Sequence, residues 1–223
     1  MKKGIIIGAG IGGLTTAIAL LKKGIDTTIF EQASQLNEVG DGLWVAPNGM
    51  KVFEQLQLAD DIINAGNTLE KIEVLDWNKR TISSINGEKI RAKHHFATTT
   101  IHRATLQNIL YKQLPEENVV LEKKFVAFEQ DQEKITAYFA DGSCESADFL
   151  LLADGIKSIF NLNLFPDHKL RYSGQTCWRF VVNFQLPNSF RNEMQEIWSK
   201  KKRGTNRIFA NQCKSGLCVH NQL

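Results

Sequence analysis

Residues 4–31 read GIIIGAGIGGLTTAIALLKKGIDTTIFE, and this stretch decides the fold. It contains Gly-x-Gly-x-x-Gly at residues 8–13, after an apolar β-branched run and before apolar residues at helical spacing. A second apolar run, Thr27 to Phe30, is typical of another strand, and Glu31 follows it directly. The order strand, glycine turn, helix, strand and acid predicts a βαβ unit that binds a dinucleotide.

Each residue type in this unit has a physical role. Gly8 permits the tight turn, Gly10 lets a pyrophosphate approach bare backbone, and Gly13 lets the helix pack close to the strand. The helix N-terminus offers free N–H groups and about half a positive charge, which favour a phosphate. Glu31 stands where a carboxylate accepts both ribose hydroxyls, and it disfavours the 2′-phosphate of NADP. The unit alone does not separate NAD from FAD.

Two other interpretations of the N-terminus fail. Lys2 and Lys3 before an apolar run resemble a secretory signal, but the glycines interrupt the run and no small-residue cleavage site follows. A membrane span needs about 20 consecutive apolar residues, and glycine and threonine break this run sooner.

Composition narrows the function classes. The net charge of +3 is too weak to argue for a nucleic-acid partner, and no segment predicts a membrane partner. The four cysteines form no Cys-x-x-Cys pair and no zinc spacing, which favours reduced thiols in a cytoplasmic protein. The histidines are scattered as well, and we expect no metal site.

Further along the chain, helical and strand patterns alternate and then give way to β-meanders. We expect a glycine turn at residues 40–42 and, after Pro47, an amphipathic helix with Met50, Val52, Phe53, Leu56 and Leu58 as its apolar positions. Hairpins are expected at Asn78-Lys79 and Asp141-Gly142. A helix is expected from Ile101 to Tyr111, with Thr105 as its cap, and an apolar strand from Phe149 to Ala153.

Five segments in order resemble the class A flavoprotein monooxygenases, the para-hydroxybenzoate and salicylate hydroxylase kind. The resemblance covers residues 1 to about 200. After the unit ending in Glu31, the segments are VGDGLWVAPNGMKVFEQLQL (39–58), Ile101-His102-Arg103 with Leu106, LLLADGIKS (150–158) and YSGQTCWRFVV (172–182). The resemblance implies an α/β fold: a Rossmann-like FAD-binding domain, with a parallel sheet and a β-meander, and an incomplete β-rich substrate lobe.

The resemblance implies that FAD occupies the glycine site and that NAD(P)H is the reductant. Dioxygen then adds to the reduced flavin to give a hydroperoxide, and a hydroxyl passes to a small, aromatic organic substrate. Arg103 is expected to reach the FAD, although an exposed arginine at a helix start is the alternative. Asp154 and Gly155 are expected in the flavin region, against a plain turn, and Val126 near the adenine, against core packing.

The predicted cofactor-binding residues are Gly8, Gly10, Ile11, Gly12, Gly13, Glu31, Gln32, Gly42, Arg103, Val126, Asp154 and Gly155. No catalytic residue is identified. The substrate stays open, because Trp44, Trp178 and Phe180 fit either its pocket or an ordinary core.

The predicted domains are discontinuous. Residues 1–70 and 99–168 are expected to form the FAD-binding domain, and residues 71–98 and 169–223 a partial substrate domain. The family's third FAD motif, Gly-Asp-Ala-Ala-His, is absent, which suggests a C-terminal truncation and a complementing polypeptide that carries the rest.

Residues 203–223 are read as a possible aberrant tail. A one-nucleotide shift from Arg203 permits codons for an apolar segment, GALIGFSQISANQV. Alternatives to the active enzyme are a non-catalytic FAD-binding remnant and an NAD-binding redox or regulatory module.

Overall fold

The computed structural model describes residues 2–36, 42–156, 158, 165, 167, 171, 172, 174, 177–182, 192–198, 211–213 and 216–222, and for 177–182, 211–213 and 216–222 only the backbone. Gly40 and Asp41 of the predicted turn, and residues 199–210 before and within the predicted tail, lie outside the described residues. Two strands in the tail are described, β15 (Asn211–Cys213) and β16 (Gly216–Gln222).

The chain divides into two compact units, and the division falls inside one helix. The first unit comprises Met1–Glu38 with Leu106–Arg171, and the second Val39–Thr105 with Tyr172–Leu223. The predicted FAD-binding domain includes residues 39–70 and 99–105, whereas the observed division places these residues in the second unit. The predicted domain boundaries stay a prediction.

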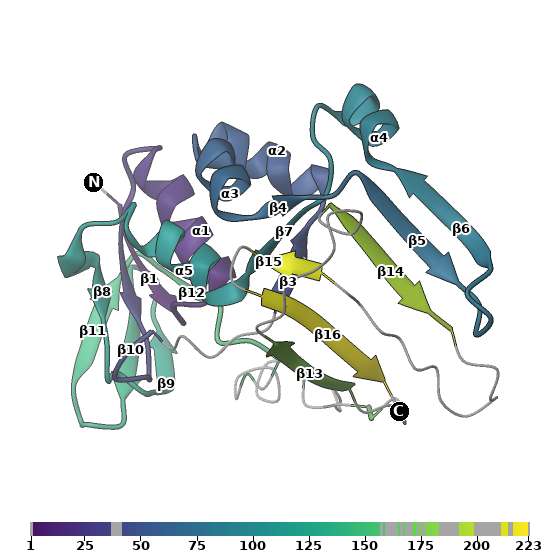
Figure 1. Ribbon diagram of the computed structural model, residues 1–223. Coiled ribbons are helices and arrows are strands. Elements are labelled where there is room, and N and C mark those ends of the chain that lie inside the picture. The colour runs from purple at the N-terminus through teal and green to yellow at the C-terminus, as the bar shows by residue number, and fades with distance from the viewer. Residues whose placement is uncertain are drawn as a thin grey trace. The chain divides into compact units, whose positions relative to one another are not determined.

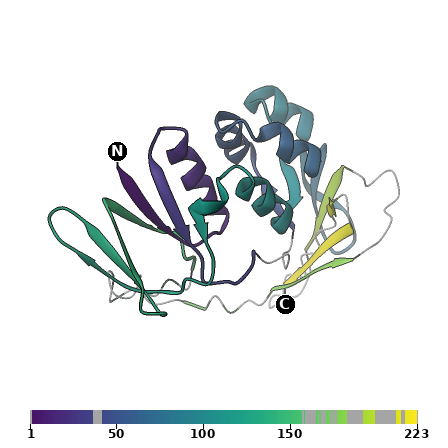
Figure 2. The same cartoon turned by 90° about the vertical axis from the view of Figure 1, so that its left-hand side faces the viewer.

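The described residues of the first unit form a four-stranded parallel sheet in the order β12-β1-β2-β8. Figure 1 labels β12, β1 and β8 of this sheet. Strands from distant parts of the sequence therefore lie side by side, as the purple and teal arrows show (Figure 2). Helix α1 (Ile11–Leu21) joins β1 to β2, so the predicted βαβ unit is confirmed. The strands are β1 (Lys3–Ile7), β2 (Asp26–Phe30), β8 (Val119–Val120) and β12 (Phe149–Leu152).

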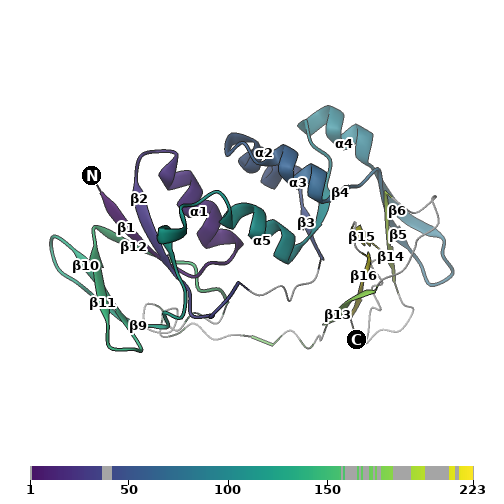
Figure 3. The same cartoon turned by 60° about the vertical axis from the view of Figure 1, so that its left-hand side comes forward.

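The strand β1 is apolar throughout because both of its faces are covered. Ile6 faces α1, since its Cγ2 lies 3.4 Å from where a Cβ on Gly13 would be. Ile5 and Ile7 point the opposite way, into a core with Phe30, Phe139 and other buried residues. That core is closed by an antiparallel meander (Figure 3). Its strands are β9 (Phe125–Gln130), β10 (Ile135–Phe139) and β11 (Cys144–Ala147).

The turn between β10 and β11 confirms the predicted Asp141-Gly142 hairpin, and Gly142 has φ +83°. The Lys123 ammonium contacts the Asp141 carboxylate at 2.5 Å and the Ser143 hydroxyl at 2.8 Å. This contact ties the segment before β9 to the hairpin turn.

The described residues of the second unit form three three-stranded sheets with short helices. The hairpin predicted at Asn78-Lys79 is confirmed by the antiparallel pair β5–β6, which β14 joins in parallel. The sheet orders are β14-β5-β6, β3-β7-β4 and β13-β16-β15. The strands are β3 (Gly42–Val45), β4 (Asn67–Thr68), β5 (Lys71–Leu75), β6 (Thr81–Asn86), β7 (Thr99–His102), β13 (Cys177–Val182) and β14 (Glu193–Ile197).

Two predicted helices differ from the observed ones. The helix after Pro47 ends at Gln55, so Leu56 and Leu58 are buried beyond its end, and Val52 is exposed. The segment 101–111 is not helical throughout, because Ile101 and His102 pair with β3 as part of β7. Thr105 therefore lies inside the helix and is not its cap. The helices are α2 (Pro47–Gln55), α3 (Ala59–Ala65), α4 (Gly87–His94) and α5 (Arg103–Tyr111), with a 3₁₀ turn at Glu116–Asn118.

Candidate nucleotide-binding site

Two glycines of the loop are required by the protein's own packing. Gly8 has φ +102°, and a Cβ there would lie 2.6 Å from the Ala153 carbonyl oxygen. A Cβ on Gly13 would lie 2.0 Å from the carbonyl oxygen of Gly8. A side chain at either position forces backbone atoms apart, so these glycines allow the close turn and the close helix that the sequence predicts.

The other two glycines are not explained by packing. Among the described residues, a Cβ at Gly10 or at Gly12 would meet no atom within 4 Å beyond its chain neighbours and the helix's own backbone, and Gly10 has an ordinary φ of −70°. Gly10 is also the N-cap of α1, and no side chain caps the helix there. The first N–H groups of a helix have no intrahelical acceptor, and the helix dipole makes them favourable for an anion. The open backbone at Gly10 therefore fits a phosphate group.

Glu31 lies at the carboxyl end of β2, half-buried, and binds the glycine loop directly. Its Oε2 accepts the Ala9 N–H at 2.8 Å, and its Oε1 accepts the Ala33 N–H at 3.0 Å. A carboxylate has about four acceptor sites, so two stay available for ribose hydroxyls. Gln32, the next residue, is exposed.

The sequence analysis missed one residue that binds this loop. The Gln107 side chain, on α5, donates from Nε2 to the Ala9 carbonyl oxygen at 2.7 Å. The two residues are 98 positions apart, so no local motif indicates the contact. Its only trace in the sequence is that Gln107 directly follows Leu106 of the His-Arg-x-x-Leu segment.

Asp154 and Gly155 lie at the same edge of the sheet as the glycine loop. The strand before them, β12, is parallel to β1, and the Ala153 N–H donates to the Ile7 carbonyl at 2.8 Å. Gly155 has φ +87°, which an L side chain rarely adopts. Asp154 is half-buried. Ligands of open α/β sheets bind at this carboxyl edge.

In the second unit the structure brings Gly42 and the residue before Arg103 together. Gly42 is the first residue of β3 and pairs with His102, so it is a strand residue. Arg103 begins α5 and is exposed. Trp44, on the same face of β3 as Gly42, is 43% exposed. The structure does not describe the side chains of the other two candidate substrate-pocket residues, 178 and 180.

Val126 lies on β9 and is 42% exposed, while its neighbour Phe125 is buried in the core of the first unit. Core packing, the alternative to a place near the adenine, therefore does not hold for Val126, whereas Phe125 does pack in the core. Its place near an adenine stays a prediction.

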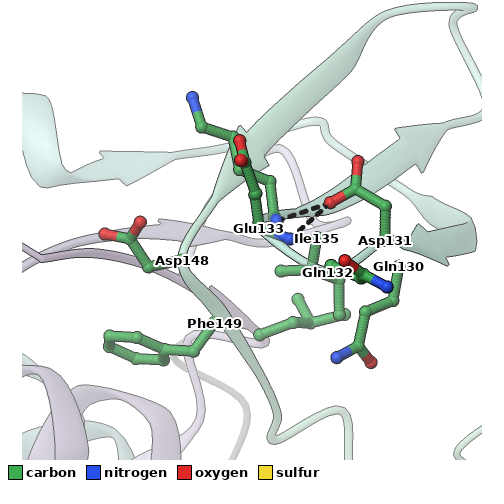
Figure 4. Close-up of a pocket in the computed structure, with 9 residues that line it drawn as sticks. Gln130, Asp131, Gln132, Glu133, Ile135, Asp148 and Phe149 are labelled. Atoms are coloured by element: carbon green, nitrogen blue, oxygen red, sulfur yellow. Dashed lines mark hydrogen bonds between the residues drawn. The ribbon is translucent and has the colours of Figure 1, made fainter.

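A hollow of about 270 Å³ lies at the opposite end of the first unit's strands, between the β9–β10 turn and the start of β12 (Figure 4). Two of its carboxylates accept hydrogen bonds from backbone amides. Asp131 accepts the N–H groups of Glu133 and Lys134, and Asp148 accepts that of Lys3. Both aspartates are exposed. The bonds of Asp131 are those of a turn residue, and Asp148 is bonded to the first residue of β1, so we assign no ligand to this hollow.

Within the described part of the chain, no three His, Cys, Asp or Glu side chains are grouped so that they could hold a metal ion. No described helix has the length and apolar content that crossing a membrane requires.

Comparison with known proteins identifies the family. The FAD binding domain family matches residues 2–194. The aurachin C monooxygenase/isomerase of Stigmatella aurantiaca is 35% identical over 186 residues, covering 82% of this chain and 49% of the relative. The FAD-dependent urate hydroxylase of Klebsiella pneumoniae is 30% identical over 184 residues, covering 81% of this chain and 47% of the relative.

The fold is shared with solved structures. Klebsiella pneumoniae HpxO complexed with FAD and uric acid superposes with a TM-score of 0.87 at 24% identity, covering 100% of this chain and 56% of that one. The chain spans about half the length of the curated relatives it matches. FAD is the cofactor of the matched family. The glycine loop, the Glu31 carboxylate and the match over residues 2–194 agree, and the chain belongs to the FAD binding domain family.

Proposed function

We propose that the chain holds the ADP half of FAD in a flavin-dependent monooxygenase. The observation that carries the proposal is the glycine loop, where Gly8 and Gly13 are required by packing but Gly10 and Gly12 border open space at an uncapped helix N-terminus. Protein packing alone does not explain glycine at the last two positions, whereas a pyrophosphate against the backbone does.

Each predicted residue then has a task. The N–H groups of Gly10, Ile11 and Gly12 bind the pyrophosphate, and Glu31 binds the ribose with its remaining acceptor sites. Arg103 adds charge-assisted hydrogen bonds, and Asp154 bonds a polar group of the cofactor. When bound, FAD supplies hydride acceptance and dioxygen activation, which no side chain provides.

The reaction proposed is hydroxylation of a small, aromatic organic substrate, with NAD(P)H as reductant and dioxygen as oxidant. Its support is the family membership and the ring substrate named for the matched urate hydroxylase. Because the chain spans about half of that relative, we propose that catalysis needs the remaining length of the family, which a complementing polypeptide can carry. The cysteine pattern supports a cytoplasmic location.

The test begins with the flavin absorbance of the purified protein and the dissociation constant for added FAD. NADH and NADPH consumption is then measured under air and without oxygen. Tight FAD binding with oxygen-dependent consumption supports the monooxygenase. FAD binding without consumption supports the non-catalytic alternative. Binding of NAD in preference to FAD overturns the proposal in favour of an NAD-binding module.

A further inference from the structure

The middle residue of the glycine loop is held on both sides. Ala9 is fully buried, its N–H donates to Glu31 at 2.8 Å, and its carbonyl accepts from Gln107 at 2.7 Å. The two partners come from separate elements, the end of β2 and the helix α5. The bond from Glu31 is local to the βαβ unit, whereas the bond from Gln107 reaches the loop from outside it.

These bonds act on two successive peptide planes. The Ala9 N–H belongs to the plane that joins Gly8 to Ala9, and the Ala9 carbonyl belongs to the plane that joins Ala9 to Gly10. In a trans peptide the C=O and the N–H of one plane point in opposite directions. Because Gln107 fixes the Ala9 carbonyl, it also fixes the Gly10 N–H, which points away from Gln107.

Position 107 requires a hydrogen-bond donor of this length. A glutamine amide donates and stays neutral, whereas an ionised glutamate only accepts and would face the carbonyl with like charge. Without the donor, the buried carbonyl loses its partner, and the Ala9–Gly10 plane is free to rotate.

We propose that Gln107 is a positioning residue for the cofactor, which orients the Gly10 N–H toward the pyrophosphate by holding the Ala9 carbonyl. The inference rests on the proposed FAD-binding function and adds to it a residue outside the glycine motif. Gln107 does not itself touch the cofactor in this role.

The test compares Gln107→Met with Gln113→Met. Methionine keeps the length and the helix propensity of glutamine but cannot donate. Gln113 is the matched control, because it also donates to a carbonyl, that of Ile109, but at an exposed place after α5. We expect Gln107→Met to weaken FAD binding by about three- to thirtyfold. Gln113→Met should bind as the wild type does.

A structural role is separated from positioning by two further measurements. Urea unfolding of the cofactor-free proteins gives the folded fraction, and the dissociation constant is corrected for it. Gln107→Glu is then titrated with FAD at pH 8 and pH 5, each relative to the wild type. An ordinary glutamate has a pKa of about 4.3, so a minority of the side chains is protonated at pH 5, and repulsion between the carboxylate and the Ala9 carbonyl raises that share. The protonated form can donate, so the variant should bind weakly at pH 8 and recover part of the loss at pH 5.

Three results overturn the inference while the proposed function stands: a wild-type dissociation constant in Gln107→Met, equal weakening in both methionine variants, or a loss that the folded fraction explains entirely. If Gln107→Met does not fold, absence of any pH recovery in Gln107→Glu overturns it. A wild type that binds no FAD overturns the proposed function itself, and this inference with it.

Discussion

Gly12 and Gly13 are neighbours in one helix, yet the structure demands glycine at only one of them. Gly13 faces the loop, where a Cβ would collide with the carbonyl oxygen of Gly8, and Gly12 faces open space. The same contrast separates Gly8 from Gly10. At the residue scale the motif is therefore two kinds of glycine, one serving the fold and one serving the ligand.

Alanine substitution distinguishes the two kinds. Gly13→Ala should lower the free energy of unfolding by about 1–3 kcal/mol, because the backbone must shift to admit the methyl group. Gly12→Ala should raise it by about 0.5–1 kcal/mol, because alanine loses less conformational entropy in a helix. Urea denaturation of the cofactor-free variants measures both, and equal effects at the two positions would contradict the assignment.

At the scale of elements, the β10–β11 turn is fastened by charge. The pKa of Asp141 lies well below its usual range, mainly because the Lys123 ammonium donates a hydrogen bond to its carboxylate and secondly because Ser143 does. The Lys123 ammonium also lies 5.7 Å from the centroid of the Phe139 ring, which belongs to the core. The turn is thereby linked to the packing beneath it.

The depressed pKa sets the sign of a pH effect. The folded state binds this proton less readily than the unfolded chain does, so the stabilisation is complete above the unfolded value of about 3.9. It is lost as the pH falls through the lower, folded pKa. Asp141→Asn should therefore lose less stability than the wild type on acidification below pH ~4. Thermal unfolding across this pH range measures the difference in stability loss between the wild type and Asp141→Asn. In a Lys123→Met background, most of that difference should disappear.

Helix α5 begins at Arg103, which is exposed, so its contribution to folding is expected to be small. Arg103→Met should change the free energy of unfolding by less than about 0.5 kcal/mol. If its role in binding FAD holds, the dissociation constant should rise about tenfold or more, since charged hydrogen bonds are lost. Arg91→Met on α4, another exposed helical arginine, is the control. Unchanged FAD binding in Arg103→Met would favour the exposed-arginine interpretation.

At the scale of the whole molecule, the first unit is assembled from two stretches of the chain. Its sheet places β1 between β2 and β12, and β2 between β1 and β8. Its core takes Ile5, Ile7 and Phe30 from the first stretch and Phe125 and Phe139 from the second. Neither stretch alone covers the apolar faces of the sheet.

A fragment of residues 1–105 should therefore lack a folded first unit. Two parallel strands and one helix bury too little apolar surface to offset the chain entropy. A fragment of residues 1–172 contains both stretches and should retain the sheet. Circular dichroism during urea titration tests this. A cooperative unfolding transition of the first unit is expected for residues 1–172 and not for residues 1–105. The expectation would be contradicted if residues 1–105 unfolded equally cooperatively and the backbone amides of their βαβ unit were protected from hydrogen exchange.

Local patterns predicted much of this architecture. The hairpins at Asn78-Lys79 and Asp141-Gly142 follow from turn residues between alternating strands, so neighbouring residues suffice to specify them. The helix predicted from Ile101 is wrong at its first two residues, because their apolar spacing is also compatible with a strand. Only pairing with Gly42 and Leu43 of β3 decides that His102 and Ile101 are extended. Likewise the apolar run of β12 predicts a strand but not its place at the sheet's edge, where Leu151 is 36% exposed.

The sequence by itself determined the βαβ unit, its glycine turn and the position of Glu31, because these depend on steric limits and contacts within about one supersecondary unit. The tertiary structure alone decided which glycines are required by packing, that Glu31 holds the Ala9 amide, and that Gln107 holds the Ala9 carbonyl. Those contacts depend on where separate elements meet. A hydrogen bond across 98 residues exists only once the sheet and helix α5 are in place, and no spacing in the chain encodes it.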